Sequence, residues 1–163
     1  MDDNQTVAAT RSRTELVRRL EQYPAEFKRA VLDIATREQL RQPAFDGGWG
    51  VVEIIPHLRD WEEIYFNRIR SILKEDRPAL PSFDDTLWSI ERDYRSLDPY
   101  ETFENFAERR AQTTELLRNA GPDDWERIGV HGYYGDITLQ WLAGHIAEHD
   151  LEHLQQSQEA LTV

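Results

Sequence analysis

Three of the five histidines in the chain lie close together near its C-terminus, at four-residue steps. They are His145, His149 and His153. A helix advances about 100° per residue, so His149 and His153 fall within roughly 20° of Leu142, and His145 lies further round at about 60°. A helix of a globular protein normally carries its apolar stripe on that face. Two imidazoles at positions expected to be buried therefore need a physical cause.

Three causes can place a pair of histidines on a buried helix face. The rings can be satisfied by ordinary hydrogen bonds, or they can form a cluster that responds to pH. A buried polar nitrogen without a partner costs about 1–3 kcal/mol, however, and each ring has two nitrogens. One divalent cation can bind a nitrogen from each ring, because side chains four residues apart on a helix are about 5–6 Å apart at Cβ. We therefore interpret His149 and His153 as a pair of metal ligands.

A third ligand must come from another helix. Three protein ligands with an open position are typical of a catalytic metal site, whereas a structural zinc site usually has four. His57 falls at the flank of an apolar helical stripe, and His131 falls in a segment without periodicity. We therefore predict a site formed by His57, His149 and His153. Three imidazoles without sulfur suit Zn, Ni or Fe(II). His145 is expected to pack beside the site or to hydrogen-bond to a ligand, and its role as a ligand stays open.

Five helical patterns position these residues. They cover about 10–42, 51–73, 84–97, 101–119 and 138–159. Pro24 should kink or interrupt the first pattern, and Pro56 should bend the second directly before His57. The short third segment, 84–97, is expected to turn Leu87, Ile90, Tyr94 and Leu97 inward. Thr138 can cap the last helix.

The remaining segments are expected to be irregular. Residues 74–83 and 122–137 show no convincing strand pattern, although a loop as long as the second is usually functional or packed. Four long helices and one short one predict an all-α fold, an antiparallel four-helix bundle with one extra short helix. The length of 163 residues suits a single domain over residues 1–163, with residues 1–9 as a flexible N-terminus.

Composition excludes several classes of partner. The formal net charge of −12 argues against binding to nucleic acid or to an anionic membrane surface. No apolar run approaches the roughly 20 residues that a membrane span needs, and the first residues lack the features of a signal peptide. The chain has no cysteine, so it offers neither a disulfide nor a thiol nucleophile. We expect a cytoplasmic protein.

Three segments together resemble a known family. They are the Ile-Pro-His-Leu-Arg-Asp-Trp-Glu run at 55–62, the glycine- and tyrosine-rich run at 130–139, and the histidine run at 145–154. The first and last are similar to the second-helix and last-helix motifs of the DinB superfamily, and the resemblance spans about 24–158. It implies a four-helix bundle with the crossover topology of that family.

The resemblance also implies a function. It implies a divalent metal ion held by His57, His149 and His153, and a homodimer, since members often dimerise. Some relatives are S-transferases that use low-molecular-weight thiols, and others are thiol-dependent isomerases. The implied partner is thus a small-molecule substrate or a thiol.

In such a site the metal would deprotonate a bound water or thiol, as zinc does when it lowers the pKa of water to about 7. Asp60, one turn after His57, could then act as a catalytic base or orient a ligand; alternatively it is a surface carboxylate paired with a basic side chain. Tyr133 and Tyr134 could cover the open side of the site or face solvent.

Three rival interpretations remain. His149 to His153 imitates the HExxH motif of a zinc protease, but Asp150 stands where that motif needs Glu. A di-iron carboxylate bundle would need two Glu-x-x-His motifs, and the chain offers only Asp150-x-x-His153. A non-enzymatic protein of stress response or binding, in which a metal mainly stabilises the bundle, would show the same histidines as a transferase or a hydrolase.

Overall fold

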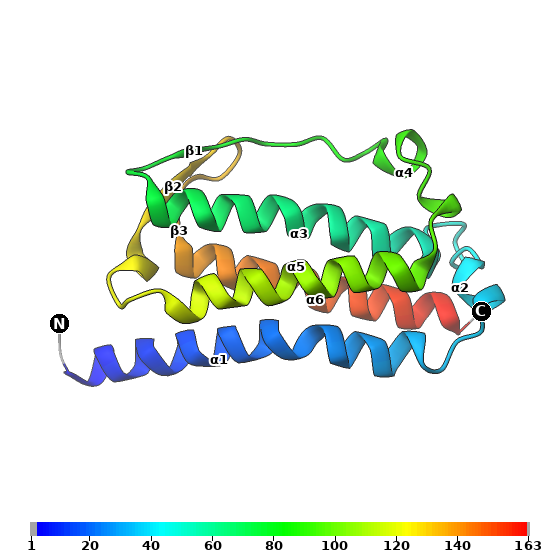
Figure 1. Cartoon of the computed structure of the whole chain (residues 1–163), viewed down its shortest axis with the longest axis horizontal. Helices are drawn as coiled ribbons and strands as arrows, with labels where there is room; N and C mark the ends of the chain where they lie inside the picture. The colour runs from blue at the N-terminus through cyan, green and yellow to red at the C-terminus, as the bar shows by residue number, and fades with distance from the viewer. Residues whose placement is uncertain (1–2, 163) are drawn as a thin grey trace.

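The computed structural model describes residues 3–162, with side chains described from residue 12 onward. Four long helices lie side by side along the molecule (Figure 1). They are α1 (Asp3–Phe27), α3 (Val51–Lys74), α5 (Pro99–Asn119) and α6 (Leu139–Leu161). The predicted four-helix bundle is confirmed. None of the helices in the described part of the chain is both long and apolar enough to cross a bilayer.

The four helices differ in direction. In Figure 1, α1 and α6 run one way along the bundle, and α3 and α5 run the other way. Each helix packs against two others, so that the order around the bundle is α1, α5, α3, α6. Because α3 and α5 are successive long helices that run in the same direction, the chain between them must return along the whole bundle. This crossover segment, residues 75–98, passes over α3 (Figure 1).

The crossover segment is less helical than the sequence indicates. It contains β1 (Ala79–Leu80), α4 (Trp88–Glu91) and a 3-10 turn (Tyr94–Ser96). The prediction of one helix over 84–97 with Leu87 and Ile90 inward is wrong, because these side chains are 55% and 77% exposed. Asp93 adopts a left-handed conformation with φ 45°, which ends the helix after one turn. Tyr94 is buried as predicted, and Trp88 is buried in place of Leu87 and Ile90.

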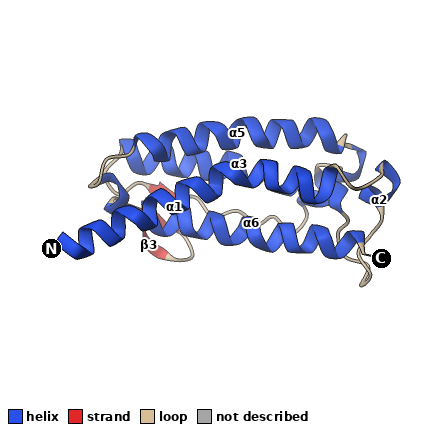
Figure 2. Cartoon of the chain, turned by 90° about the horizontal axis from the view of Figure 1, so that it is seen from below, coloured by secondary structure: helices blue, strands red, loops and turns tan. Residues whose placement is uncertain are grey.

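A small sheet stands where the sequence predicted no strand. It pairs β1 in parallel with β2 (Ile128–His131), which pairs antiparallel with β3 (Gly135–Thr138). Gly129 permits this, since a Cβ there would lie 2.6 Å from Leu80 and 2.9 Å from Ile72. Gly135, with φ +72°, closes the hairpin. The sheet joins the crossover segment to the start of α6, where Figure 2 shows β3.

Neither of the two prolines expected to disturb a helix ends the helix in which it lies. α1 continues through Pro24, and the irregularity follows it as a π-helical turn at Lys28–Leu32. A separate short helix, α2 (Arg37–Arg41), begins after Thr36, whose side chain forms a capping box with Gln39. α3 is likewise one helix through Pro56. As predicted, Thr138 caps α6 by accepting a hydrogen bond from the Trp141 amide at 3.0 Å.

The N-terminal helix begins at Asp3 rather than near Thr10. The flexibility expected for residues 1–9 stays a prediction, and residues 1–2 of that segment lie outside the described residues.

Two apolar clusters form the core, one toward each end of the bundle. One includes Ile69, Ile146 and the sheet residue Ile137, and the other includes Phe27 and Phe106. A buried ionic cluster lies between them along the helices, and it consists of Arg110 on α5, Glu62 on α3 and Asp150 on α6. The apolar core is therefore interrupted at mid-bundle by charged groups.

The ionic cluster ties all four long helices together. Arg110, 2% exposed, donates to both carboxylate oxygens of Asp150 at 2.7 and 2.8 Å, to Glu62 at 2.9 Å and to the Leu20 carbonyl at 3.2 Å. Burial raises the pKa of Asp150 to about 6, although Arg110 opposes this change. Asp150 follows His149 directly, so its attachment to Arg110 fixes the rotation of α6 about its axis.

Candidate metal centre

The structure brings the three predicted ligands together from two helices. His57 lies on α3, and His149 and His153 lie one turn apart on α6. The Nε2 atoms of His57 and His149 are 3.2 Å apart, and those of His149 and His153 are 3.1 Å apart. One nitrogen from each ring lies within 4.8 Å of the other two. The site therefore depends on the packing of α3 against α6.

A hydrogen bond to His153 and a carboxylate facing His57, each on the far side of its ring, orient the nitrogens of the cluster. Nδ1 of His153 lies 2.8 Å from Oε1 of Gln156, an atom that only accepts, so Nδ1 carries the proton. Nδ1 of His57 faces Oδ2 of Asp85 at 3.8 Å, which favours the same tautomer. In both rings the lone pair of Nε2 then points toward His149.

This arrangement fits a cation better than a network of hydrogen bonds. Nε2 of His149 faces two Nε2 lone pairs, and a neutral ring can donate only one proton there. One close contact between nitrogens is thus left without a proton. Burial lowers the pKa of His57 to about 4 and also lowers the pKa values of His149 and His153, with further lowering from the neighbouring histidines for His57 and His149. The rings are neutral at pH 7, which is the state that binds a metal.

Comparison with known proteins places the chain in a family. The model of the DinB superfamily matches residues 9–157. The chain is a member of the DinB superfamily. The resemblance seen in the histidine motifs is thereby confirmed, and it extends through all four long helices of this DinB-superfamily bundle.

Two curated relatives are similar to this DinB-superfamily chain over most of their length. YfiT from Bacillus subtilis (strain 168), named as an inferred metal-dependent hydrolase, is 32% identical over 136 residues, which are 83% of this chain and 76% of YfiT. OB0782 from Oceanobacillus iheyensis, named in the same way, is 30% identical over 141 residues, which are 86% of this chain and 80% of that protein.

Solved structures show the same fold. The structure of YfiT, described as an unusual four-helix bundle topology, is similar with a TM-score of 0.83 at 30% identity and covers 91% of this chain and 85% of YfiT. TT2238, a four-helix bundle protein, is similar with a TM-score of 0.64 at 18% identity over 90% of this chain and 98% of TT2238. The second likeness concerns the fold alone.

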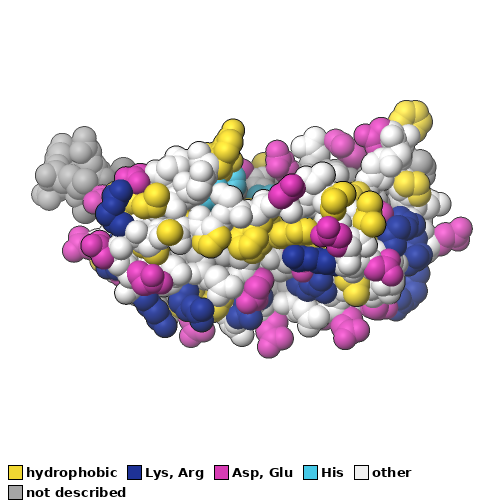
Figure 3. All heavy atoms as spheres, turned by 90° about the horizontal axis from the view of Figure 1, so that it is seen from above, with side chains coloured by type: hydrophobic (Ala, Val, Ile, Leu, Met, Phe, Trp, Pro, Cys, Tyr) yellow, Lys and Arg dark blue, Asp and Glu magenta, His cyan; other side chains and the backbone are white. Residues whose placement is uncertain are grey.

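A pocket of about 480 Å³ opens above the histidines of this DinB-superfamily bundle. Trp61, Tyr65 and Phe83 form aromatic walls, and the three histidines lie at one end. Figure 3 shows histidine side chains inside a hollow on the face that carries the crossover segment. The volume is within the range of sites that hold small molecules.

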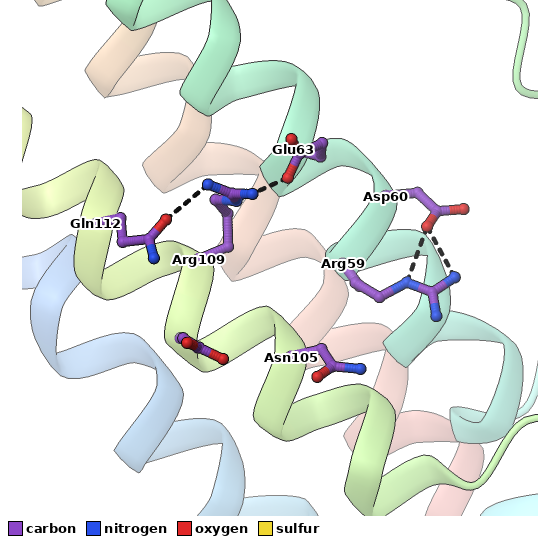
Figure 4. Close-up of a pocket in the computed structure, with 7 residues that line it drawn as sticks. Arg59, Asp60, Glu63, Asn105, Arg109 and Gln112 are labelled. Carbon is purple, nitrogen blue, oxygen red and sulfur yellow. Dashed lines mark hydrogen bonds and ion pairs between the residues drawn. The ribbon is translucent and has the colours of Figure 1, made fainter.

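Asp60 does not lie in this pocket. Its carboxylate accepts hydrogen bonds from Arg92 at 2.7 Å, from the Tyr94 hydroxyl at 2.6 Å and from Arg59 at 2.9 Å. Figure 4 shows Arg59 and Asp60 on α3 beside the groove toward α5. Asp60 lies three residues after His57 on α3, so its side chain points about 60° away from that of His57 around the helix axis. This rotation lets it contact residues of the crossover segment. The placement supports the structural alternative for Asp60 and not a catalytic base.

Asp85 is the carboxylate that the sequence reasoning missed. It lies on the crossover segment, lines the pocket, and accepts a hydrogen bond from the Trp61 indole at 2.9 Å while facing His57. In the sequence, Asp85 stands only near the start of an expected helix. Its approach to His57 depends on the fold of the crossover segment, which has no periodic pattern.

The other two histidines also line the pocket. His145 stacks on Trp141 with ring centroids 4.9 Å apart and an interplanar angle of 12°, so it packs beside the three-histidine cluster. His131, at the end of β2, was predicted to lie in an irregular loop. Tyr133 and Tyr134 lie at the pocket rim and are 82% and 50% exposed.

Proposed function

We propose that the protein is a metal-dependent enzyme in which His57, His149 and His153 hold one divalent cation, Zn, Ni or Fe(II), beside a small-molecule pocket. The observation that carries this proposal is the convergence of three Nε2 atoms at one end of an open pocket. Such a cation supplies Lewis acidity, which lowers the pKa of a bound water or thiol toward neutrality. The reaction class is therefore transfer of a group from the substrate to water or to a low-molecular-weight thiol.

The residues around the histidines support this chemistry. Three protein ligands leave room for a further group, as in catalytic zinc sites. Gln156 is within hydrogen-bond distance of the outer nitrogen of His153, and Asp85 faces the outer nitrogen of His57, so both favour ring orientations that suit a metal. Trp61 and Tyr65 line the pocket and pack in or against the bundle core, so they offer an apolar surface to a substrate.

The names of relatives agree with the first branch of this proposal. YfiT and OB0782 are named for metal-dependent hydrolysis, in which water is the acceptor. The second branch, S-transfer to a small thiol, rests on the family resemblance of the histidine motifs. The two branches share one metal centre and differ in which acceptor enters the pocket.

A non-enzymatic role is the second candidate. The histidines join α3 to α6, so a metal between them would cross-link two helices that are distant in sequence. His57 is also buried, as a residue of a structural site would be. In that case the metal would stabilise the bundle and the pocket would have no catalytic use.

One experiment separates the candidates. The metal content of protein purified without a histidine tag is measured, and activated esters and soft electrophiles are then tested as substrates with and without added small thiols. We expect turnover that His149→Ala abolishes and that Gln155→Ala, an exposed change on the same helix, leaves unchanged. If His149→Ala only lowers the melting temperature and the wild type turns over none of these compounds, the non-enzymatic role is favoured.

We further propose that the protein is a cytoplasmic homodimer. The dimer rests on the family resemblance, and the cytoplasm is the default compartment expected from the sequence. Sedimentation equilibrium of the metal-loaded protein tests the dimer, and a single species with the mass of one chain would refute it.

A further inference from the structure

Arg68 is a buried cation that lacks a counterion. It lies on α3 and is 6% exposed. Its Nη2 donates a hydrogen bond to the Pro81 carbonyl at 2.7 Å. Within the described part of the chain no carboxylate pairs with it, and its Nε has no hydrogen-bond partner. The faces of Trp61 and Phe83, at 5.6 and 6.0 Å, offer only partial compensation.

This isolation is unusual for the chain. The protein carries 31 acidic residues against 19 basic ones, so carboxylates are plentiful. The other deeply buried guanidinium, Arg110, contacts two of them. Burial lowers the pKa of Arg68, yet a guanidinium stays protonated in proteins. A buried charge without a partner is costly unless a ligand supplies the opposite charge.

Arg68 lines the same pocket as the three-histidine cluster, and a second donor, His131, lines it too. Nδ1 of His131 accepts hydrogen bonds from the amides of Tyr133 at 2.9 Å and Tyr134 at 3.1 Å. The proton of this neutral ring is therefore on Nε2, which is a donor. Both side chains line the pocket, together with the hydroxyl-bearing Ser82.

We propose that Arg68 and His131 bind a carboxylate of the substrate, whose reacting group lies at the three-histidine end of the same pocket. The second half of this statement rests on the proposed function, whereas the anion site itself does not. A guanidinium beside a neutral imidazole carries one positive charge, which matches a monoanionic carboxylate better than a phosphate dianion. The substrate class is therefore a small organic acid, or a thiol that carries a carboxylate.

The test follows the Arg68 Nε–H directly by NMR in the zinc-loaded full chain. The cross-peak is assigned by its loss in Arg68→Lys. Propionate and its neutral analogue propionamide are then titrated at pH 7.5. We expect a saturable downfield shift with propionate and at least about tenfold weaker binding of propionamide. Equal shifts with both compounds, or no saturable shift with propionate, would overturn the proposal.

The same titration of metal-free protein tests the anion site independently of the proposed function. Propionate should shift the same cross-peak without zinc, since Arg68 is not a metal ligand. If the shift requires zinc, the carboxylate binds the metal instead and the anion site is refuted. If the protein binds no metal and shows no turnover but the metal-free shift persists, the proposed function fails and the anion site stands.

A pair of variants tests whether Arg68 itself binds the carboxylate. Arg68→Met should abolish the propionate-dependent shift of the His131 ring protons, and Arg70→Met, an exposed change on the same helix, should keep it. Retention of that shift in Arg68→Met would refute the role of Arg68. If Arg68→Met does not fold, the titration of the wild-type cross-peak decides the question by itself.

Discussion

Nε2 of His153 lies 3.1 Å from Nε2 of His149, one turn away on α6, and both nitrogens belong to rings that burial keeps neutral. Two lone-pair donors at that separation favour a shared cation over a shared proton, because His57 approaches the same point from α3. The consequences concern stability and metal binding.

Metal loading should stabilise the fold. A ligand present at 100 times its dissociation constant adds about 2.7 kcal/mol to the free energy of unfolding if it binds only the folded state. For a chain of this size that corresponds to a rise of roughly 5–10 °C in melting temperature. Calorimetry with zinc and with a chelator measures it. His149→Ala should show no zinc-dependent rise, and an equal rise in that variant would place the metal elsewhere.

Asp85 should matter for metal binding and Asp60 should not. Partners of ligating histidines typically change metal affinity by about 10–100-fold when they are removed. We expect Asp85→Asn to weaken zinc binding in that range, because it faces Nδ1 of His57. Asp60→Asn, which disturbs the contacts to Arg59, Arg92 and Tyr94, should change zinc affinity by less than about threefold. Competition with a chromophoric chelator measures both, and the reverse order would restore Asp60 to the site.

Arg110→Met should be strongly destabilising. It would leave the carboxylates of Glu62 and Asp150 buried without their cation, a change that costs about 3–5 kcal/mol. Urea unfolding measures the loss. Arg109→Met, which removes a partly exposed pair with Glu63, is the matched control with an expected cost of at most about 1 kcal/mol. Similar losses in the two variants would contradict the role given to the buried cluster.

A pair of glycines tests the packing of the sheet. Gly129→Ala should cost about 1–3 kcal/mol, because the new methyl group would meet Leu80 and Ile72. Gly144→Ala, in the middle of α6 with no atom within 4 Å of the added Cβ, should stabilise the protein by up to about 1 kcal/mol. Thermal unfolding of both variants checks the prediction, which fails if Gly129→Ala is neutral.

The helices and the histidine cluster could be predicted because their signals are local. The apolar periodicity marks α3 and α6, and the four-residue step between His149 and His153 fixes their shared face. His57 followed as the remaining histidine on an apolar helical stripe. Each of these inferences needs only the geometry of a single helix.

The crossover segment and the sheet could not be predicted in the same way. β1 spans only Ala79–Leu80, and its partner strand is some fifty residues away, so no short window contains the pattern. Asp85 reaches His57, and Arg68 stays without a carboxylate, only because of how that segment crosses α3. The two alternatives for Asp60 could not be separated from the sequence for the same reason, since its partners Arg92 and Tyr94 also lie on the crossover segment.

The most direct test of the metal centre is anomalous diffraction at the zinc edge from crystals of tag-free, zinc-loaded protein. We predict one strong peak about 2.0–2.1 Å from a ring nitrogen of each of His57, His149 and His153. A map without a peak between α3 and α6, or with a peak that His57 does not reach, would contradict the account.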